Sequence, residues 1–366
     1  MITTQDITII GGGIIGLLTA REFINAGATV SLIEKNNVGQ ESSWAGGGIL
    51  LPLYPWRQHQ AITQLVIQSL SLYPELATQL IAETGLDPEW RQCGLLITQN
   101  PDIKSALNWC LENSINYALA NTEQLKNLNS QPENPLWLPD IAQARNPRLI
   151  KSLFQQLINK GLRCYQHCEV NRIHISKQQI NSIDTSSGQF NVNQLVITTG
   201  AWTSQWFAQF FAHSQIIQPK IQPVKGQMLL YEAQPDTLPF IVLENDQYLI
   251  PRLDGKILAG STVEQSEFNK TPTITAKEKL HDFAVNLLPT LKNLSPINHW
   301  AGLRPATEHG IPYIDKHPDI VNLSVNAGHF RNGLAMGPAS AQLLVDLVLN
   351  RPTQIKPEAY QFSSLH

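Results

Sequence analysis

Charged residues are few in this sequence, and they do not cluster by sign. Lysine, arginine, aspartate and glutamate make up 15% of the 366 residues, the formal net charge is −3, and no block of lysines or arginines occurs. Proteins that bind nucleic acid need a basic patch for the phosphate backbone, so we expect no nucleic-acid partner. The hydrophobic fraction of 42% suits a globular protein, and the length predicts two domains.

Targeting signals and long apolar runs are also missing. The opening stretch MITTQDITII has no basic n-region, and no run of about 18 apolar residues follows it. We therefore expect no secretory signal, no membrane contact and a cytoplasmic location.

Cysteines are scarce, and no two of them form a CxxC pair. They are Cys93, Cys110, Cys164 and Cys168. Because His167 lies between the last two, a metal site is one interpretation of this stretch. Reduced structural thiols in a cytosolic protein are the favoured interpretation, so we expect no metal.

Glycines, by contrast, form two runs near the N-terminus, GGGIIG at 11–16 and GGG at 46–48. Glycine inside regular structure costs roughly 0.5–1 kcal/mol relative to alanine, so each run needs a physical reason. DITII before the first run is typical of a short buried strand, and IIGLLTAREFINAG after it has apolar residues at helical spacing. ATVSLIEK then predicts a second strand. This order predicts the βαβ unit that begins a doubly wound sheet.

The first run matches the GxGxxG pattern of dinucleotide-binding proteins through Gly11, Gly13 and Gly16. Glycine at these positions allows a tight turn, close approach of a pyrophosphate, and close packing of helix on strand. The helix N-terminus that begins near Ile14 and Ile15 offers free N–H groups and a partial positive charge to the phosphates. A glycine-rich turn without a ligand is the alternative interpretation.

An acidic residue follows at the distance expected for an adenosine site. Glu34 ends the second predicted strand, 18 residues after Gly16, and Lys35 comes next. A carboxylate at this place accepts hydrogen bonds from both ribose hydroxyls. It also disfavours a 2′-phosphate, so the pattern favours FAD or NAD over NADP.

The second glycine run favours FAD over NAD. A nicotinamide enzyme needs no second glycine loop after the adenosine-binding strand, whereas a flavin enzyme can pass bare main chain along the ribitol and the flat ring. The two serines before the run would supply hydroxyls to the pyrophosphate or ribitol. The residues expected along FAD here are Ser42, Ser43, Gly46, Gly47, Gly48 and Ile49.

The rest of the chain predicts an interrupted α/β fold. Residues 58–84 and 147–160 have helical spacing, and residues 219–265 contain β-type runs, two of which flank the hairpin signal Asp254-Gly255. After Trp300, NLSVNAG and GPASAQLLVDLVLN predict a final strand and helix. We therefore expect an α/β protein, α+β overall, with an antiparallel substrate-binding sheet inserted into a Rossmann-like FAD-binding domain.

These segments also set the expected domain boundaries. The FAD-binding domain would be discontinuous and comprise residues 1–84, 140–215 and 300–366. The substrate-binding domain would comprise residues 85–139 and 216–299.

Three segments resemble the FAD-dependent D-amino-acid oxidase family, and in particular its bacterial glycine oxidases. SSWAGGGILLPLYPW is similar to the family's loop after the adenosine-binding strand. HWAGLRPATEHGIPYID is similar to its GLRP segment, and NAGHFRNGLAMGPASAQLL to its C-terminal flavin-binding segment. The segments occur in the family's order and those between them fit in length, so the resemblance covers nearly the whole chain.

The resemblance implies a substrate site built on three side chains. Arg304 matches a guanidinium that holds the substrate carboxylate in a two-point contact, which fixes orientation as well as charge. Tyr248 matches a tyrosine whose hydroxyl helps to bind the same carboxylate. Arg331 matches a second arginine, for which contact with the substrate is favoured over a place in the flavin pocket alone.

The resemblance also implies FAD contacts outside the glycine runs. Val170 falls where the family's backbone contacts the adenine, and Gly200 and Trp202 belong to a turn beneath the cofactor. Backbone N–H groups near the start of the last helix would face the pyrimidine end of the ring and stabilise negative charge there. These residues are His329, Phe330, Arg331, Asn332, Gly333 and Leu334.

The activity implied by the resemblance is oxidative deamination of glycine, sarcosine or small D-amino acids. A hydride would pass from the substrate α-carbon to flavin N5, water would hydrolyse the imino acid, and dioxygen would reoxidise the flavin to give hydrogen peroxide. No base with a family role occurs among the pocket residues, so the amine would react in its neutral form. FAD would be bound non-covalently, because no cysteine lies after residue 168.

Two other interpretations stay open at this point. One is a D-amino-acid dehydrogenase that passes electrons to a quinone, and the other is a dinucleotide-binding protein without turnover.

By resemblance the protein would be a homodimer or homotetramer, and its imine product would serve the thiazole ring of thiamine.

Overall fold

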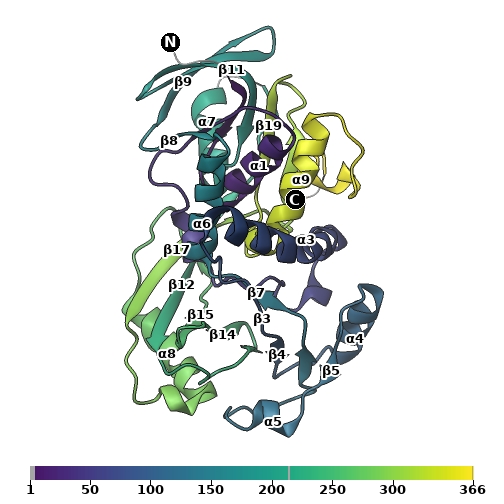
Figure 1. Ribbon diagram of the computed structural model, residues 1–366, viewed down its shortest axis with the longest axis vertical. Helices are drawn as coiled ribbons and strands as arrows, with labels where there is room; N and C mark the ends of the chain where they lie inside the picture. Colours follow the sequence, from purple (N-terminus) through teal and green to yellow (C-terminus); the bar gives the residue numbers. More distant parts are fainter. Residues whose placement is uncertain (1–4, 213–214, 365) are drawn as a thin grey trace.

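The protein contains two large β-sheets that follow one another along its longest axis (Figure 1). The computed structural model describes residues 5–212, 215–364 and 366. Within them, eight strands form the first sheet, in the upper half of Figure 1, and nine form the second, in the lower half. A two-stranded ribbon, β3 (Arg91–Gln92) with β7 (Ala142–Gln143), lies near the middle.

The first sheet has a parallel centre. In spatial order its main strands are β8 (Arg163–Tyr165), β2 (Val30–Ile33), β1 (Gln5–Ile10), β11 (Gly188–Ile197), β19 (Leu323–Ala327) and β18 (Tyr313–Lys316). All neighbours in this series are parallel except β18, which adds an antiparallel edge. The carboxyl ends of β1, β2 and β11 therefore meet at one edge, where open α/β sheets bind their ligands.

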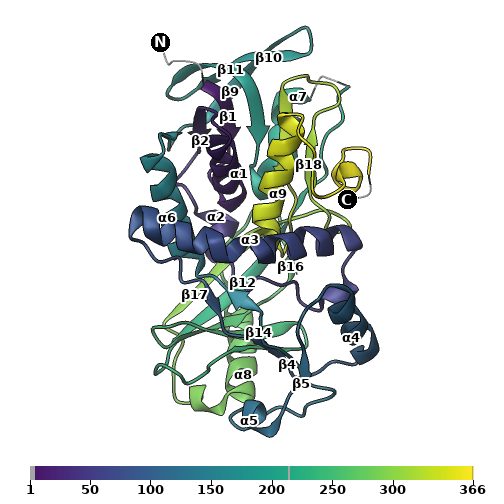
Figure 2. The ribbon, with the colours of Figure 1, turned by 45° about the vertical axis from the view of Figure 1, so that its right-hand side comes forward.

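Helices cover one face of the first sheet and form its larger core. α1 (Ile14–Asn25) and α9 (Gly333–Val348) lie side by side on this face, and α3 (Gln60–Thr84) runs across the end of the pair (Figure 2). α6 (Asn146–Asn159) packs against α1 and α3. Among the helices of the described residues, none is long and apolar enough to cross a membrane.

The opposite face has a core of its own. Ile9 of β1 enters the core on the α1 side and Ile10 enters this second core, because side chains alternate along a strand. The second core is covered by α7 (Thr203–Phe211) and by the hairpin of β9 (Val170–Ser176) and β10 (Gln179–Thr185), which extends β11. The sequence did not predict this hairpin, because most of its side chains are polar or exposed.

The second sheet is mostly antiparallel and is built around β12 (Gln222–Glu232). β12 pairs with β17 (Asn298–Ala306) and β15 (Lys256–Gly260), and α8 (Ile274–Leu287) packs on it. The remaining strands are β14 (Gln247–Pro251), β13 (Ile241–Glu244), β4 (Leu95–Ile97), β6 (Leu136–Leu138), β5 (Ala118–Leu119) and β16 (Glu264–Gln265). The shorter helices are α2 (Glu41–Ala45), α4 (Ile103–Glu112) and α5 (Thr122–Leu125), with 3₁₀ turns at Pro55–Arg57, Gly200–Trp202, Pro289–Leu291 and Pro357–Tyr360.

This architecture confirms the predicted fold class and the βαβ opening of the chain. The hairpin predicted at Asp254-Gly255 joins β14 to β15, with Gly255 at φ +84°. β17 belongs to the second sheet, so the domain boundary expected at residue 300 falls inside a strand. The division into an FAD-binding and a substrate-binding domain stays a prediction.

Candidate functional site

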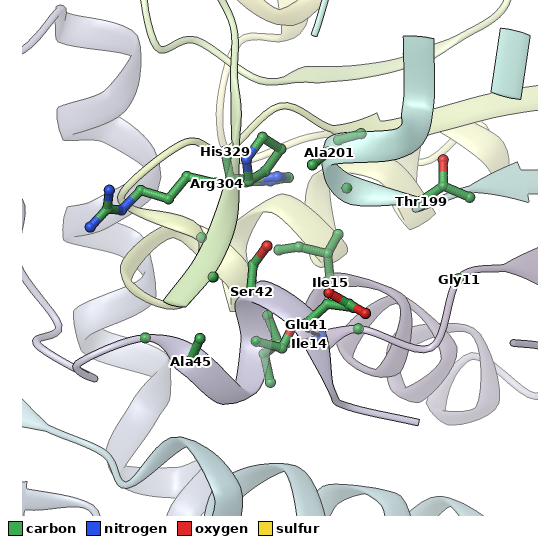
Figure 3. Close-up of a pocket in the computed structure, with 18 of the residues that line it drawn as sticks. Gly11, Ile14, Ile15, Glu41, Ser42, Ala45, Thr199, Ala201, Arg304 and His329 are labelled. Atoms are coloured by element: carbon green, nitrogen blue, oxygen red, sulfur yellow. Dashed lines mark hydrogen bonds between the residues drawn. The ribbon is translucent and has the colours of Figure 1, made fainter. Parts of the chain in front are cut away.

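A cavity of about 670 Å³ lies between the two sheets, at the carboxyl ends of β1, β2 and β11. α1, α2 and the start of α9 form one part of its wall, and β12, β14 and β17 form the other. This volume is within the range of small-molecule and cofactor sites, roughly 300–1,000 Å³. Figure 3 shows Ser42 and Ala45 of α2 on one side of the cavity and Arg304 and His329 on the other.

The first glycine run forms the tight turn between β1 and α1. Gly11 has φ +108°, and a Cβ there would lie 2.6 Å from the carbonyl oxygen of Thr198. Gly11 and Gly13 line the cavity. Gly16 does not line it; a Cβ there would lie 2.0 Å from the Gly11 carbonyl oxygen, so this glycine allows α1 to pack closely on the turn.

Two helices direct their N-termini toward the cavity. α1 presents Ile14 and Ile15 to it, and α9 presents Gly333 and Leu334. The backbone N–H of Ile14 donates to the hydroxyl oxygen of Ser43 at 2.8 Å. The partial positive charge of both helix ends favours a ligand that carries phosphate or develops negative charge.

Glu34 lies at the cavity where the sequence pattern expects the adenosine to bind. Its carboxylate accepts hydrogen bonds from the backbone N–H groups of Gly12 and Asn36, both at 2.8 Å. Lys35 also lines the cavity, and its ammonium pairs with Glu169 at 2.6 Å. The two backbone bonds hold the Glu34 carboxylate at the end of β2.

The second glycine run lines the cavity with its main chain. Contacts with neighbouring protein atoms also restrict the side chains that these positions could carry. A Cβ on Gly47 would lie 2.7 Å from Cδ1 of Ile250, and a Cβ on Gly48 would lie 2.0 Å from the carbonyl oxygen of Ala144. From the sequence we expected these glycines to leave room for the ligand alone. The structure adds that the Ala144 backbone leaves no room for a side chain at Gly48, and that a side chain at Gly47 would displace Ile250.

Arg304 lies at the end of the cavity formed by the second sheet. Its guanidinium donates to the carbonyl oxygen of Thr262 at 3.0 Å and to the hydroxyl of Ser261 at 2.9 Å. It lies directly over Gly226 of β12, where a Cβ would come within 2.1 Å of Nη2. Burial lowers the pKa of Arg304; neighbouring Tyr248 opposes this shift, and the positive charge of Arg331 adds to it.

Buried polar atoms without a partner concentrate at this cavity. Of the nine such side-chain atoms in the described part of the chain, five belong to residues that line it. They are Asn146 Oδ1, Trp206 Nε1, Asn326 Oδ1, His329 Nε2 and Arg331 Nη2. Each such atom costs about 1–3 kcal/mol when it stays unpaired. Polar groups of a ligand in the cavity could pair with such atoms.

Nearly all of the residues predicted from the sequence come together here. With the exception of Gly16, every residue predicted to contact FAD or substrate lines the cavity, although their segments are far apart in the chain. Those not yet placed above are Ile49, Val170, Gly200, Trp202, Phe330 and Asn332. Ser42 also donates its hydroxyl to the carbonyl oxygen of Leu303. The individual roles of these residues stay predictions.

Sequence reasoning missed several residues of the cavity wall. Thr198 and Thr199 end the strand before Gly200, a position that strand-end reasoning could have found. Lys270 carries no motif; its ammonium contacts both carboxylate oxygens of Glu41 at 2.7 Å, and both residues line the cavity. This ion pair joins the second sheet's loops to α2 across the cavity.

The cysteine stretch considered as a metal site has a structural explanation. Cys164 lies in β8, where burial raises the pKa of its thiol to about 12 with a further contribution from Glu34. In residues 5–212, 215–364 and 366, no three His, Cys, Asp or Glu side chains are grouped so as to hold a metal ion.

Comparison with known proteins identifies the family of the chain. The family model described as "FAD dependent oxidoreductase" matches residues 6–347. The chain belongs to this family. FAD is therefore its cofactor, and the cavity contains the groups that FAD requires: two helix N-termini, main chain without side chains, and unpaired polar atoms.

Individual relatives are similar over nearly the whole chain. A protein named glycine oxidase from Pseudomonas aeruginosa is 40% identical over 364 residues, which cover 98% of each chain. A bifunctional protein ThiO/ThiG from Synechocystis is 28% identical over 99% of this chain and 54% of its own length. The crystal structure of glycine oxidase from Geobacillus kaustophilus superimposes with a TM-score of 0.90, at 25% identity over 98% of each chain.

The buried imidazole of His329 predicts a loss of stability in acid. Burial lowers the pKa of His329 to about 3, below the ordinary value of 6.5, so the unfolded chain takes up a proton that the folded chain does not. The free energy of unfolding should therefore fall by about 1.4 kcal/mol per pH unit for this proton between pH 6.5 and 3. We expect His329→Gln to flatten the pH dependence by that amount.

Urea unfolding of the FAD-free protein at pH 7.5, 6 and 5 measures this effect. His309→Gln is the matched control, because His309 is exposed on the surface. Equal slopes for the parent and His329→Gln would contradict the prediction.

Proposed function

We propose that this protein is an FAD-dependent oxidase for glycine and other small amino acids. The overall change would convert glycine, water and dioxygen into glyoxylate, ammonia and hydrogen peroxide. The observation that carries the proposal is the Arg304 guanidinium, which is half-buried at the cavity wall and hydrogen-bonded to two carbonyl oxygens and a hydroxyl rather than to a carboxylate. Its charge is thus left for an anionic ligand. The glycine oxidases among the relatives support this choice.

Each cavity residue has a definite task in this proposal. Arg304 holds the substrate carboxylate by a two-point contact, and Tyr248 of β14 lies beside it to share that contact. Arg331, whose Nη2 has no partner, is the second cation for the same anion. Bound FAD supplies the acceptor for the hydride that leaves the substrate α-carbon.

The protonation states in the cavity favour a neutral amine as the reacting form. Burial keeps His329 neutral, with a pKa of about 3, so it is too weak a base to take a proton from the substrate at neutral pH. Arg304 and Arg331 are cations, and cations nearby disfavour an ammonium group. The amine therefore loses its proton before or during binding, and turnover should rise with pH.

The relatives named glycine oxidase favour a small substrate. Leu51, Leu53 and Met228 add apolar side chains to the cavity wall. Such a wall accepts a methyl group but discriminates by only about 1–3 kcal/mol per methylene. Glycine, sarcosine and D-alanine therefore belong to one substrate class. The alternative considered from the sequence, a quinone-linked D-amino-acid dehydrogenase, has less support because the relatives are named oxidases.

Assays of hydrogen peroxide release test the activity directly. With the FAD-loaded protein in air, we expect peroxide from glycine, sarcosine, D-alanine and D-proline, and none above background from L-alanine and L-proline. Flavin bleached by glycine without peroxide on admission of air would favour the dehydrogenase. A preference for L-substrates, or no bleaching by any of the six, would overturn the proposal.

Removal of the Arg304 charge should separate substrate binding from cofactor binding. A bidentate contact to a charged group is worth several kcal/mol, so we expect Arg304→Met to lower kcat/KM for glycine by about 100-fold or more. FAD content should stay at the parent level. Arg351→Met is the control, because Arg351 is exposed after α9 and does not line the cavity. Unchanged turnover in Arg304→Met would refute the assignment.

The imine product connects this activity to a biosynthetic role. We propose that it serves thiazole formation in thiamine synthesis, as the resemblance implies, and the relative that joins ThiO to ThiG in one chain supports this. A deletion strain should then need added thiamine for growth. Normal growth of that strain without thiamine would count against the role.

We propose a cytoplasmic location and a homodimer or homotetramer. Cell fractionation and light scattering of the purified protein measure them.

A further inference from the structure

A buried arginine lies behind the second glycine run. Arg252 follows β14 directly, and its side chain is almost fully shielded from solvent, with 6% of the residue exposed. Its Nη2 donates to the carbonyl oxygen of Gly47 at 2.8 Å, and its Nη1 donates to the side-chain oxygen of Gln143. Gly47 lines the cofactor cavity, whereas Arg252 does not. The guanidinium therefore contacts the cavity wall from the protein side.

The charge of this arginine has no ion-pair partner in hydrogen-bond contact. Within the described part of the chain, no hydrogen bond of the guanidinium goes to a carboxylate. Glu89 attracts it from a distance, but the Glu89 carboxylate is bound to Arg145 at 3.0 Å and to Arg148 at 3.2 Å. Burial lowers the pKa of Arg252 to about 10, partly opposed by Glu89, so the group is still a cation at neutral pH.

A buried cation without such a partner is costly for folding, because its charge has lost the solvation of water. A neutral amide side chain could also donate to the Gly47 carbonyl. The hydrogen bond to Gly47 alone therefore does not explain why this side chain carries a charge. The charge can act on a ligand in the cavity on the other side of Gly47.

Arg252 also belongs to a hydrogen-bond network that connects the glycine run to two other segments. Gln143, which accepts from Arg252, donates to the carbonyl oxygen of Pro251 at 2.7 Å. The neighbours of Gln143 pair with the run itself, since the N–H of Ala144 donates to the Gly48 carbonyl oxygen at 2.9 Å. The planar fork of N–H donors in the Arg252 guanidinium therefore holds residues 46–50, the stretch around Gln143, and the end of β14 in one arrangement.

We propose that Arg252 is a positioning residue for FAD, with two effects. Its fork fixes the Gly47 main chain as a wall against which the cofactor lies, and its charge stabilises the negative charge that FAD gains on reduction. A fixed cation near a site that gains an electron pair raises its reduction potential. The inference concerns the cofactor alone and does not depend on which amino acid is oxidised.

Two substitutions separate the fork from the charge. Arg252→Met removes both, whereas Arg252→Lys keeps a cation but replaces the planar guanidinium with a single ammonium on a shorter side chain. The control is Arg21→Met: Arg21 is also buried and bonded to two glutamine side chains, but it forms an ion pair with Glu22 at 2.9 Å and does not line the cavity. The measurements are the FAD dissociation constant, the midpoint potential of the bound flavin, and the thermal midpoint of unfolding.

We expect Arg252→Met to weaken FAD binding about tenfold, which corresponds to about 1.4 kcal/mol, and to make the midpoint potential more negative. Arg252→Lys should lose a similar affinity and keep a potential near that of the parent. Arg21→Met should lower the thermal midpoint with FAD affinity and potential unchanged.

Several outcomes would overturn the inference. If Arg252→Met lowers only the thermal midpoint, as Arg21→Met does, the residue is structural and the proposal fails. If affinity falls but the potential does not move, the effect of the charge is refuted and the fork stands. If Arg252→Met does not fold, Arg252→Lys decides: parent-like FAD affinity in that variant overturns the positioning role.

Discussion

The site depends on the main chain of two glycine runs, which faces the ligand cavity on one side and packs against protein atoms on the other. Gly47 and Gly48 line the cavity, and the atoms of Ile250 and Ala144 behind them leave no space for a Cβ. The same holds for Gly11, whose missing side chain would meet the Thr198 carbonyl. Both glycine runs therefore satisfy two requirements at once, closeness to a cofactor and closeness to the fold.

This constraint also explains how the two sheets share one site. Gly226 in β12 lets the Arg304 guanidinium lie flat on the second sheet, and Gly302 in β17 lets that strand approach Ala45 of α2, where a Cβ would come within 2.6 Å. The first sheet supplies the turn, the carboxylate and the helix ends. The second sheet supplies Arg304, and Arg331 comes from the segment between β19 and α9. Each half is incomplete without the close approach that glycine allows.

Local patterns in the sequence predicted the parts of the site that short segments form. The GxGxxG turn with Glu34 follows from strand, helix and strand periods within 30 residues, and Arg304, Tyr248 and the segment around Arg331 came from resemblance to a family. The Arg252–Gly47 and Lys270–Glu41 contacts join residues 205 and 229 positions apart, and no local period encodes such pairs. For the same reason the sequence did not assign β17 to the second sheet, because its partner β12 precedes it by more than 60 residues.

The spread of the cavity wall along the chain has a consequence for synthesis. Lining residues run from Ile10 to Leu334, and β19 and α9 complete the first sheet and its larger core only near the C-terminus. A nascent chain on the ribosome therefore has no place for its yellow cofactor until almost all of it has emerged. We therefore expect FAD to bind only when synthesis of the chain is nearly complete, and chains that stop short of α9 to remain without it.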